Sequence, residues 1–263
     1  MKKHRAKLLC GLGLVTCLTA TALAGTFSPI QSKDRPLGYP ITAKVELAGS
    51  DAVSAAFQTT YEPGYLAYVK KLLPETVAFT GNGLHQLDPQ RLYFLFDYAP
   101  RVYFLYEGAC YTNALGATIA TVATPTNTPL TGNTFDIFPN THCSLSWICA
   151  SGSGVRSTSE PLLPGDFVQL PTVTAGQQLQ FFIMANLNRS GQPADVYYNG
   201  TTTNRDKFQH MIAFFPDNSS QYIIIAFEDM YGGGDRDCND VVYVVDIGPN
   251  NAALWRNPNG LPR

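Results

Sequence analysis

FEDMYGGGDRDCNDVVYVV, residues 227–245, places an acidic, glycine-rich segment directly before a run of β-branched residues. The run Val241 to Val245 favours a buried strand, and the apolar run that ends at Phe227 favours another. The three glycines at 232–234 can adopt positive φ, which allows the chain to fold back between the two strands. The stretch therefore predicts two strands joined by an acidic loop.

The loop has the composition of a calcium site, because its five carboxylates and one asparagine amide are the oxygen donors that calcium prefers. In an extended loop, residues 235, 237 and 239 face one side, whereas Arg236 and Cys238 face the other. The glycine turn can bring residues 228–229 back towards the same ion. The predicted loop ligands are Glu228, Asp229, Asp235, Asp237, Asn239 and Asp240.

Other readings of the loop fit less well. An EF-hand would need glycine where Asp240 stands and a helix where Val241 to Val245 predicts a strand. A repetitive glycine–aspartate β-roll is excluded because the motif occurs once. A solvated acidic turn without an ion remains the alternative.

The same stretch, together with EGACYTNALG at 107–116, resembles a bacterial domain family of unknown function. That family is found in secreted and surface proteins, including large calcium-dependent adhesins, and the resemblance covers roughly residues 57 to 247. The loop is also similar to the calcium loop of the two-calcium, fucose-binding bacterial lectins. This similarity implies calcium ligands at Glu228, Asp235, Asp237, Asn239 and Asp240, with Asp237 bridging two ions that bind sugar hydroxyls. The loop departs from the lectins in its longer glycine stretch and in Cys238, where they have an aromatic residue.

The N-terminus has the pattern of a secretory signal over residues 1–24. Four basic residues precede an apolar run from Leu8 to Leu23 and a small-residue cleavage site before Gly25. We therefore expect an exported protein, which is secreted, periplasmic or held at the cell surface; a lipoprotein modified at Cys17 and a retained anchor are weaker alternatives. Removing those four of the 18 basic residues and none of the 20 acidic ones changes the formal net charge from -2 to -6. Such a chain is a poor nucleic-acid binder, and no later segment has the length of a membrane span.

The cysteines predict disulfides in an exported chain. Cys110, Cys143, Cys149 and Cys238 lie outside the signal, and their spacing does not choose among the three pairings. Cys143 and Cys149 bracket a short loop that a disulfide could close. The family resemblance implies a Cys110–Cys238 pairing, because the family usually has glycine and an aromatic residue at these two positions. Buried free thiols are the alternative.

The implied Cys110–Cys238 pairing would bring the turn at 108–111 next to Asp237. This makes Asn113 a further candidate calcium ligand, although it is also an ordinary turn residue. Tyr111 and Tyr231 are candidate ligand-binding residues, because aromatic faces can pack against a sugar ring; the alternative is packing at the rim of the fold.

The remaining sequence predicts an all-β fold, an antiparallel β-sandwich or jelly roll with one short N-terminal helix. Amphipathic spacing predicts the helix at 61–73, before Pro74. The predicted strands are residues 41–47, 76–80, 91–97, 101–107, 117–124, 167–170, 179–185, 208–215, 221–227 and 241–247. We expect one calcium-binding domain at 41–247, between an extended leader at 25–40 and a loosely held tail at 248–263. Residues 116–159, which carry few charges, are expected to form long surface loops.

These features predict a secreted calcium-binding β-sandwich that recognises a carbohydrate or another cell-surface ligand, with Ca²⁺ as its cofactor. The alternative is a calcium-stabilised structural protein of an envelope or matrix, without a sugar site. The third hypothesis is a calcium-dependent extracellular hydrolase. We do not expect an enzyme, because the sequence contains no nucleophile elbow, P-loop or dinucleotide motif and no histidine at zinc-site spacing.

Overall fold

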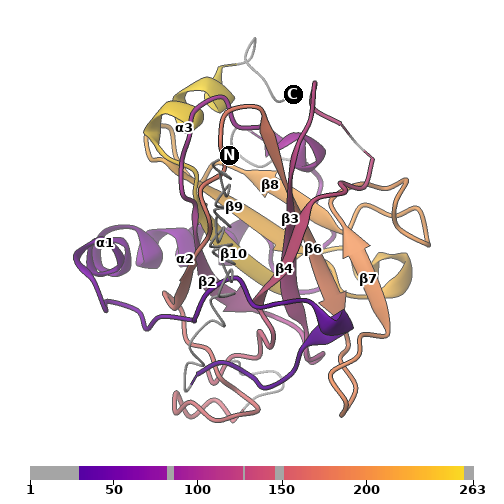
Figure 1. The fold of residues 1–263 in the computed structure, drawn as a ribbon. Helices are drawn as coiled ribbons and strands as arrows, with labels where there is room; N and C mark the ends of the chain where they lie inside the picture. The colour runs from indigo at the N-terminus through magenta and orange to yellow at the C-terminus, as the bar shows by residue number, and fades with distance from the viewer. Residues whose placement is uncertain (1–29, 82–85, 127, 146–150, 258–263) are drawn as a thin grey trace, which may run out of the picture.

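The computed structural model describes residues 30–81, 86–126, 128–145 and 151–257. The expected signal peptide, the start of the leader, Cys149 and the end of the tail lie outside these residues. The described chain forms two antiparallel sheets that pack face to face (Figure 1). This architecture confirms the all-β prediction.

The larger sheet has six strands, and every neighbouring pair is antiparallel. In spatial order they are β1 (Gln86–Leu87), β8 (Met211–Phe214), β9 (Tyr222–Phe227), β10 (Val241–Asp246), β2 (Arg101–Glu107) and β5 (Phe167–Gln169). The two strands that flank the acidic loop, β9 and β10, therefore lie side by side in the middle of this sheet.

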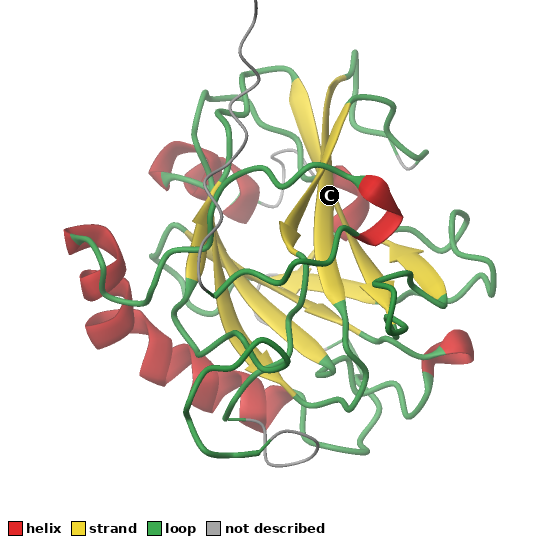
Figure 2. Cartoon of the chain, turned by 60° about the horizontal axis from the view of Figure 1, so that its bottom comes forward, coloured by secondary structure: helices red, strands yellow, loops and turns green. Residues whose placement is uncertain are grey.

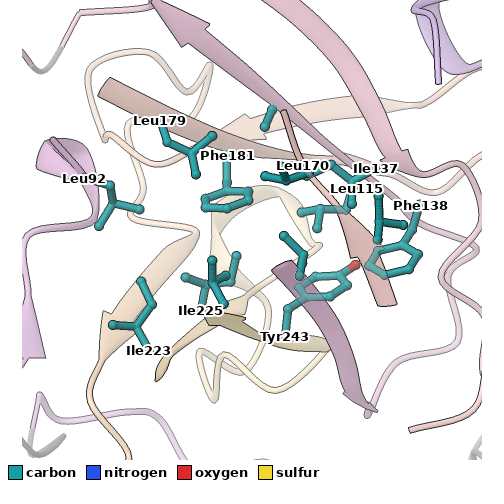
Figure 3. Close-up of a cluster of buried hydrophobic side chains, with 14 of the residues drawn as sticks. Leu92, Leu115, Ile137, Phe138, Leu170, Leu179, Phe181, Ile223, Ile225 and Tyr243 are labelled. Carbon is teal, nitrogen blue, oxygen red and sulfur yellow. The ribbon is translucent and has the colours of Figure 1, made fainter. Parts of the chain in front are cut away.

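The smaller sheet has four antiparallel strands and covers one face of the larger one. In spatial order they are β4 (Asn133–Phe138), β3 (Ala114–Thr121), β6 (Gln177–Ala185) and β7 (Asp195–Tyr198). The main hydrophobic core fills the space between the two sheets (Figure 3).

Strand β10 is buried on both faces. Val241, Tyr243 and Val245 point into the core between the sheets, and Tyr243 stacks on Phe138 with 5.7 Å between ring centroids. Its alternate residues pack into a second cluster, on the far side of the same sheet. A strand that is covered on both sides needs apolar residues at every position, which explains the uninterrupted valine-rich run.

A continuous helical segment covers the outer face of the six-stranded sheet (Figure 2). It consists of α1 (Ala52–Ala56), the π-helical turn η2 (Phe57–Tyr61) and α2 (Glu62–Leu72). This segment begins earlier than the predicted helix because Asp51 and Ser54 form a capping box. Ser54 N donates to Asp51 Oδ1 at 2.7 Å, and Asp51 N donates to Ser54 Oγ at 3.1 Å.

Several predicted strands are wrong. Residues 76–80 and 91–97 form no regular strand, and residues 41–47 form only isolated bridges. Conversely, β4 lies within the segment expected to be loops, and β7 was not predicted. The buried carboxylate of Asp136 interrupts the apolar pattern of β4, which hides the strand from a periodicity argument.

The segment expected to be a loose tail begins with a helix, α3 (Pro249–Arg256). Trp255 is fully buried, and its Nε1 donates to the Tyr93 carbonyl oxygen at 3.1 Å, so α3 is docked onto the core. The short 3₁₀ turns are η1 (Pro36–Gly38), η3 (Pro89–Arg91) and η4 (Tyr231–Gly233). Within the described ranges, no helix is both long enough and apolar enough to cross a membrane.

Candidate metal centre

The acidic loop is closed at its base by the β9–β10 pair. Phe227 lies opposite Val241 in the antiparallel register, which places Glu228 and Asp240 at the two ends of the loop. The Asp229 N–H donates to Asp240 Oδ2 at 2.7 Å and continues the pairing one step beyond the sheet. The strand pair therefore brings carboxylates from both ends of the loop together.

The loop backbone is tightly coiled and not extended as expected. Gly232, Gly233 and Gly234 all have positive φ, as do Arg236 at 67° and Cys238 at 57°. Positive φ is uncommon for non-glycine residues, so these two are held in place by their surroundings. The Arg236 guanidinium lies over the Phe208 ring, 5.2 Å from its centroid, and Cys238 packs into the apolar cluster beneath the helix.

Three carboxylates converge inside this loop. Glu228, Asp235 and Asp237 each offer an oxygen, and these oxygens all lie within 4.8 Å of one another; we call this group the carboxylate triad. Glu228 and Asp237 are 1% exposed, whereas Asp235 faces solvent. Glu228 Oε2 is buried and has no hydrogen-bond partner. A Cβ on Gly234 would lie 2.5 Å from Glu228 Oε1, so the glycine is what leaves room for this carboxylate.

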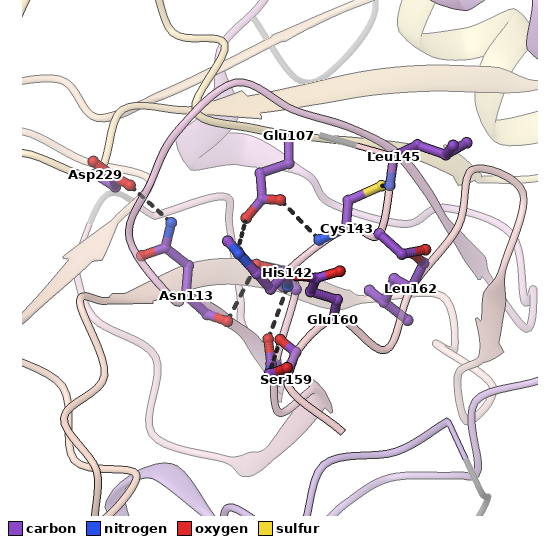
Figure 4. Close-up of polar contacts among 12 residues, drawn as sticks. Glu107, Asn113, His142, Cys143, Leu145, Ser159, Glu160, Leu162 and Asp229 are labelled. Carbon is purple, nitrogen blue, oxygen red and sulfur yellow. Dashed lines mark hydrogen bonds and ion pairs between the residues drawn. The ribbon is translucent and has the colours of Figure 1, made fainter. Parts of the chain in front are cut away.

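The other predicted ligands take different positions. Asp229 lies beside the triad and not within it, since its Oδ2 accepts a hydrogen bond from Asn113 Nδ2 at 2.8 Å (Figure 4). Asn113 Oδ1 in turn accepts from the Asn186 N–H at 3.0 Å. Asp240 is used in closing the loop base. Asn113 and Asp229 therefore form a supporting layer that ties the loop to the end of β6.

No described lysine, arginine or histidine forms an ion pair with the triad or with Asp240. Burial raises the pKa of Glu228 from 4.5 to about 7, and the charges of Asp235 and Asp237 add to this rise. Hydrogen bonds from Asp240 and the Cys238 backbone lower the pKa but do not outweigh burial. Burial also raises the pKa of Asp240, and the charges of Asp229 and Glu228 add to this rise, which brings the pKa to about 10. The site thus lacks positive charge and favours a bound proton or cation.

His210 and Asp206 form hydrogen bonds to the backbone of the loop, and neither residue was predicted as part of the site. His210 Nδ1 lies 2.8 Å from the Glu228 carbonyl oxygen, and His210 Nε2 lies 2.8 Å from Asp206 Oδ2. The same Asp206 oxygen accepts from the Gly232 N–H at 2.7 Å, while Tyr197 stacks on the imidazole at 3.6 Å. This pair links β8 to both the start and the glycine turn of the loop.

A pocket of about 190 Å³ adjoins the loop. This tyrosine pocket is lined by Tyr111, Ala185, Asn186, Ala194, Asp195, Tyr197, Asp229, Met230 and Tyr231. The structure therefore brings the two candidate ligand-binding residues, Tyr111 and Tyr231, to one pocket, which Asp229 also lines. Arg205 lies over the Tyr231 ring at 4.8 Å and forms an ion pair with Asp195 at 2.8 Å, which gives the pocket a charged rim.

The expected cysteine pairings are wrong. Cys238 is a buried free thiol, so it is not joined to Cys110. Its side chain is enclosed by the apolar cluster under the helix, which also raises its pKa through burial. Cys143 is likewise a buried thiol and not half of a Cys143–Cys149 disulfide; its sulfur accepts from the Leu145 N–H at 3.4 Å. Cys110 is disulfide-bonded, and neither other described cysteine is its partner.

The raised carboxyl pKa values predict a definite pH response of the metal-free protein. Folded Glu228 holds its proton up to about pH 7, whereas the unfolded chain loses it near 4.5, so this contribution to stability is present at low pH and lost as the pH rises through 7. In chelator, the melting temperature should fall between pH 5 and pH 8, with Glu228 contributing on the order of 2 kcal/mol. A cation held by these carboxylates would take the place of the proton, so saturating calcium should reduce the fall.

Thermal unfolding across this pH range, with and without calcium, tests that response. Glu228→Gln cannot titrate, so its melting temperature should vary less steeply with pH in chelator than that of the unmodified protein. An equal slope in the two proteins would contradict the assignment of the shift to Glu228.

Comparison with known proteins places the loop inside a family match. A family model described as "Domain of unknown function (DUF4114)" matches residues 173–248, which begin shortly before β6, end shortly after β10 and include the acidic loop. No curated protein and no solved structure matches the chain.

Proposed function

We propose that this chain is an exported calcium-binding recognition module, in which a calcium ion held by the carboxylate triad orders a loop that forms part of a ligand pocket. The observation that carries the proposal is the buried, unpartnered Glu228 Oε2, which lies in a group with Asp235 and Asp237. A buried carboxylate oxygen without a partner is costly, and a bound cation removes that cost.

The donor chemistry favours calcium. All donors of the triad are carboxylate oxygens, the ligands of hard cations, and calcium accepts irregular oxygen cages more readily than magnesium does. The neighbouring nitrogen and sulfur atoms are used elsewhere. Both ring nitrogens of His210 are hydrogen-bonded, and the Cys238 thiol packs among apolar side chains, which disfavours zinc.

The tyrosine pocket supports a role in recognition. Met230 and Tyr231 follow directly on Glu228 and Asp229, and they are 46% and 57% exposed. An ion that holds Glu228 would therefore also hold the pocket wall in place. Tyrosine faces next to polar side chains suit a carbohydrate, whose rings pack on aromatic faces while hydroxyls bind carboxylates and amides.

Binding of glycans in the presence and absence of chelator tests this proposal. We expect calcium-dependent binding to at least one carbohydrate on an array, and Tyr231→Ala should weaken it roughly tenfold, equivalent to about 1.4 kcal/mol. Phe96→Ala is the matched control, because Phe96 is an exposed aromatic bound through its backbone to α3, which follows the opposite end of β10. The control should bind as the unmodified protein does.

A structural role for calcium is the second candidate function, and the attachment of the loop to the end of α2 favours it. The Thr76 N–H donates to Asp237 Oδ2 at 2.8 Å, and Asn239 Nδ2 donates to the Leu73 carbonyl oxygen at 3.2 Å. An ion here would bind the helix to the sheet. Calcium-dependent stability without glycan binding, or with binding that Tyr231→Ala leaves unchanged, would favour this structural role over recognition.

A further inference from the structure

The segment that follows α2 runs along the acidic loop. In addition to the bonds from Thr76 and to Leu73, the Phe79 N–H donates to the Arg236 carbonyl oxygen at 2.7 Å. Between these contacts lies Glu75, whose Oε1 accepts a hydrogen bond from the Tyr106 hydroxyl at 3.2 Å. Within the described part of the chain Glu75 has no ion-pair partner.

The Asn239 side chain is oriented by its bond to Leu73. Only the amide NH₂ can donate to a carbonyl oxygen, so the bond from Nδ2 to Leu73 O directs Asn239 Oδ1 the other way. Asn239 is 1% exposed, and its Oδ1 has no hydrogen-bond partner. This is a buried acceptor that lacks a donor, separate from Glu228 Oε2.

Asn239 Oδ1 and Glu75 Oε1 face the same small space. They lie 2.1 Å and 2.8 Å from the position that a Cβ on Gly108 would take, and the Asn239 carbonyl oxygen lies 2.9 Å from that position. A side chain at 108 would fill this space. The absence of one leaves room for these oxygens. The Asn239 carbonyl oxygen accepts from the Gly108 N–H at 3.1 Å and Glu75 Oε1 accepts from Tyr106, whereas Asn239 Oδ1 has no donor.

Negative charge gathers at the same place. The N–H of Thr76, the residue after Glu75, donates to Asp237 Oδ2 at 2.8 Å, so the Asp237 carboxylate lies against the Glu75–Thr76 peptide. Asp237 also belongs to the carboxylate triad. The oxygens of Glu75, Asp237 and Asn239 are therefore a second group of hard donors, on the helix side of the loop.

We infer that Glu75, Asp237 and Asn239 form a second divalent-cation site, distinct from the carboxylate triad, which fastens the end of α2 to the acidic loop. This inference rests on the proposed function, since it assumes that the loop binds calcium. It adds a ligand from a segment far away in the sequence. The competing arrangement is a proton shared between Glu75 and Asn239 Oδ1, with no second ion.

Calorimetric titration of the purified protein with calcium separates these arrangements. We expect two bound ions per chain in the unmodified protein and one in Glu75→Gln, which keeps the size of the side chain but loses its charge. Glu228→Gln should also retain one ion, at the site that contains Glu75. Glu46→Gln is the matched control, because Glu46 pairs with Lys44 at 2.7 Å, and it should bind two.

The outcomes distinguish the two proposals. A single ion in both the unmodified protein and Glu75→Gln would overturn the second site and support the shared proton, while leaving the triad intact. Two ions in Glu75→Gln would also overturn the role of Glu75. No bound ion in the unmodified protein would instead contradict the proposed function itself. Melting curves in chelator show whether each variant is folded before its stoichiometry is compared.

Discussion

Asp237→Asn is expected to remove most of the rise in melting temperature that calcium produces in the unmodified protein. At a calcium concentration of about 100 times the dissociation constant, the unmodified protein should gain about 2.7 kcal/mol, which corresponds to roughly 5–10 °C for a chain of this size. Asp237 belongs to the triad and is 1% exposed, and asparagine removes both its charge and one of its two oxygen donors. Roughly 100-fold weaker binding reduces the gain at that concentration to about 0.4 kcal/mol, a rise in melting temperature of only about 1–2 °C.

Asp97→Asn is the matched control for this experiment. It makes the same change of charge at a surface residue whose Oδ1 accepts from the Ala175 N–H at 2.7 Å. Its melting temperature should respond to calcium as that of the unmodified protein does. A full calcium response in Asp237→Asn, measured by thermal unfolding with and without chelator, would show that the ion binds elsewhere.

Gly234→Ala is expected to destabilise the loop and to weaken calcium binding together. Gly234 has φ 44° and ψ -123°, a conformation that residues with a Cβ rarely adopt, and forcing it costs roughly 1–3 kcal/mol. The new Cβ would also lie 2.5 Å from Glu228 Oε1 and 3.3 Å from the side chain of Met230. The carboxylate would have to move away from the triad, so both the melting temperature in chelator and the calcium affinity should fall.

Gly64→Ala provides a control of opposite sign. Gly64 lies in α2, and a Cβ there would meet no atom within 4 Å. Alanine in a helix should therefore stabilise the protein by roughly 0.4–1 kcal/mol and leave calcium binding unchanged. Wild-type melting and affinity in Gly234→Ala would contradict the view that the glycine makes room for Glu228.

The charge on the triad connects these experiments. Burial raises the pKa of Glu228 and Asp240, so protons stabilise the metal-free loop. A calcium ion held by the triad would require the Glu228 carboxyl to lose its proton. Calcium affinity should therefore increase with pH over the range in which metal-free stability declines. His210 hydrogen-bonds the Glu228 carbonyl oxygen and Asn113 donates to Asp229, so both side chains support the loop.

The fold class was predictable because the strands that form the centre of the molecule carry their signal locally. The predicted strand at 101–107 coincides with β2, and those at 221–227 and 241–247 match β9 and β10 to within one residue at each end. Strand β4 was missed because Asp136, a buried acid, interrupts its pattern. The early start of the helix depended on a capping box at Asp51 that periodicity does not reveal.

The candidate site was predictable only in part. The oxygen donors of the loop are close together in the sequence, so the composition of the loop alone indicates a cation site. The pairing of Cys110 with Cys238 was wrong because the Cys238 side chain turns into the apolar cluster under the helix. Glu75 gave no signal, since an acid after the end of a helix belongs to no motif.

An acidic loop between two buried strands follows from residues 222–246 alone, because strand preference, glycine turns and oxygen donors are properties of neighbouring residues. These local properties do not determine which of the oxygen donors converge on one site. The triad excludes Asp229, and Glu75 approaches Asn239, because β9 pairs with β10 and because α2 packs on the outer face of their sheet. Contacts between segments about 160 residues apart depend on that packing, which no local pattern encodes.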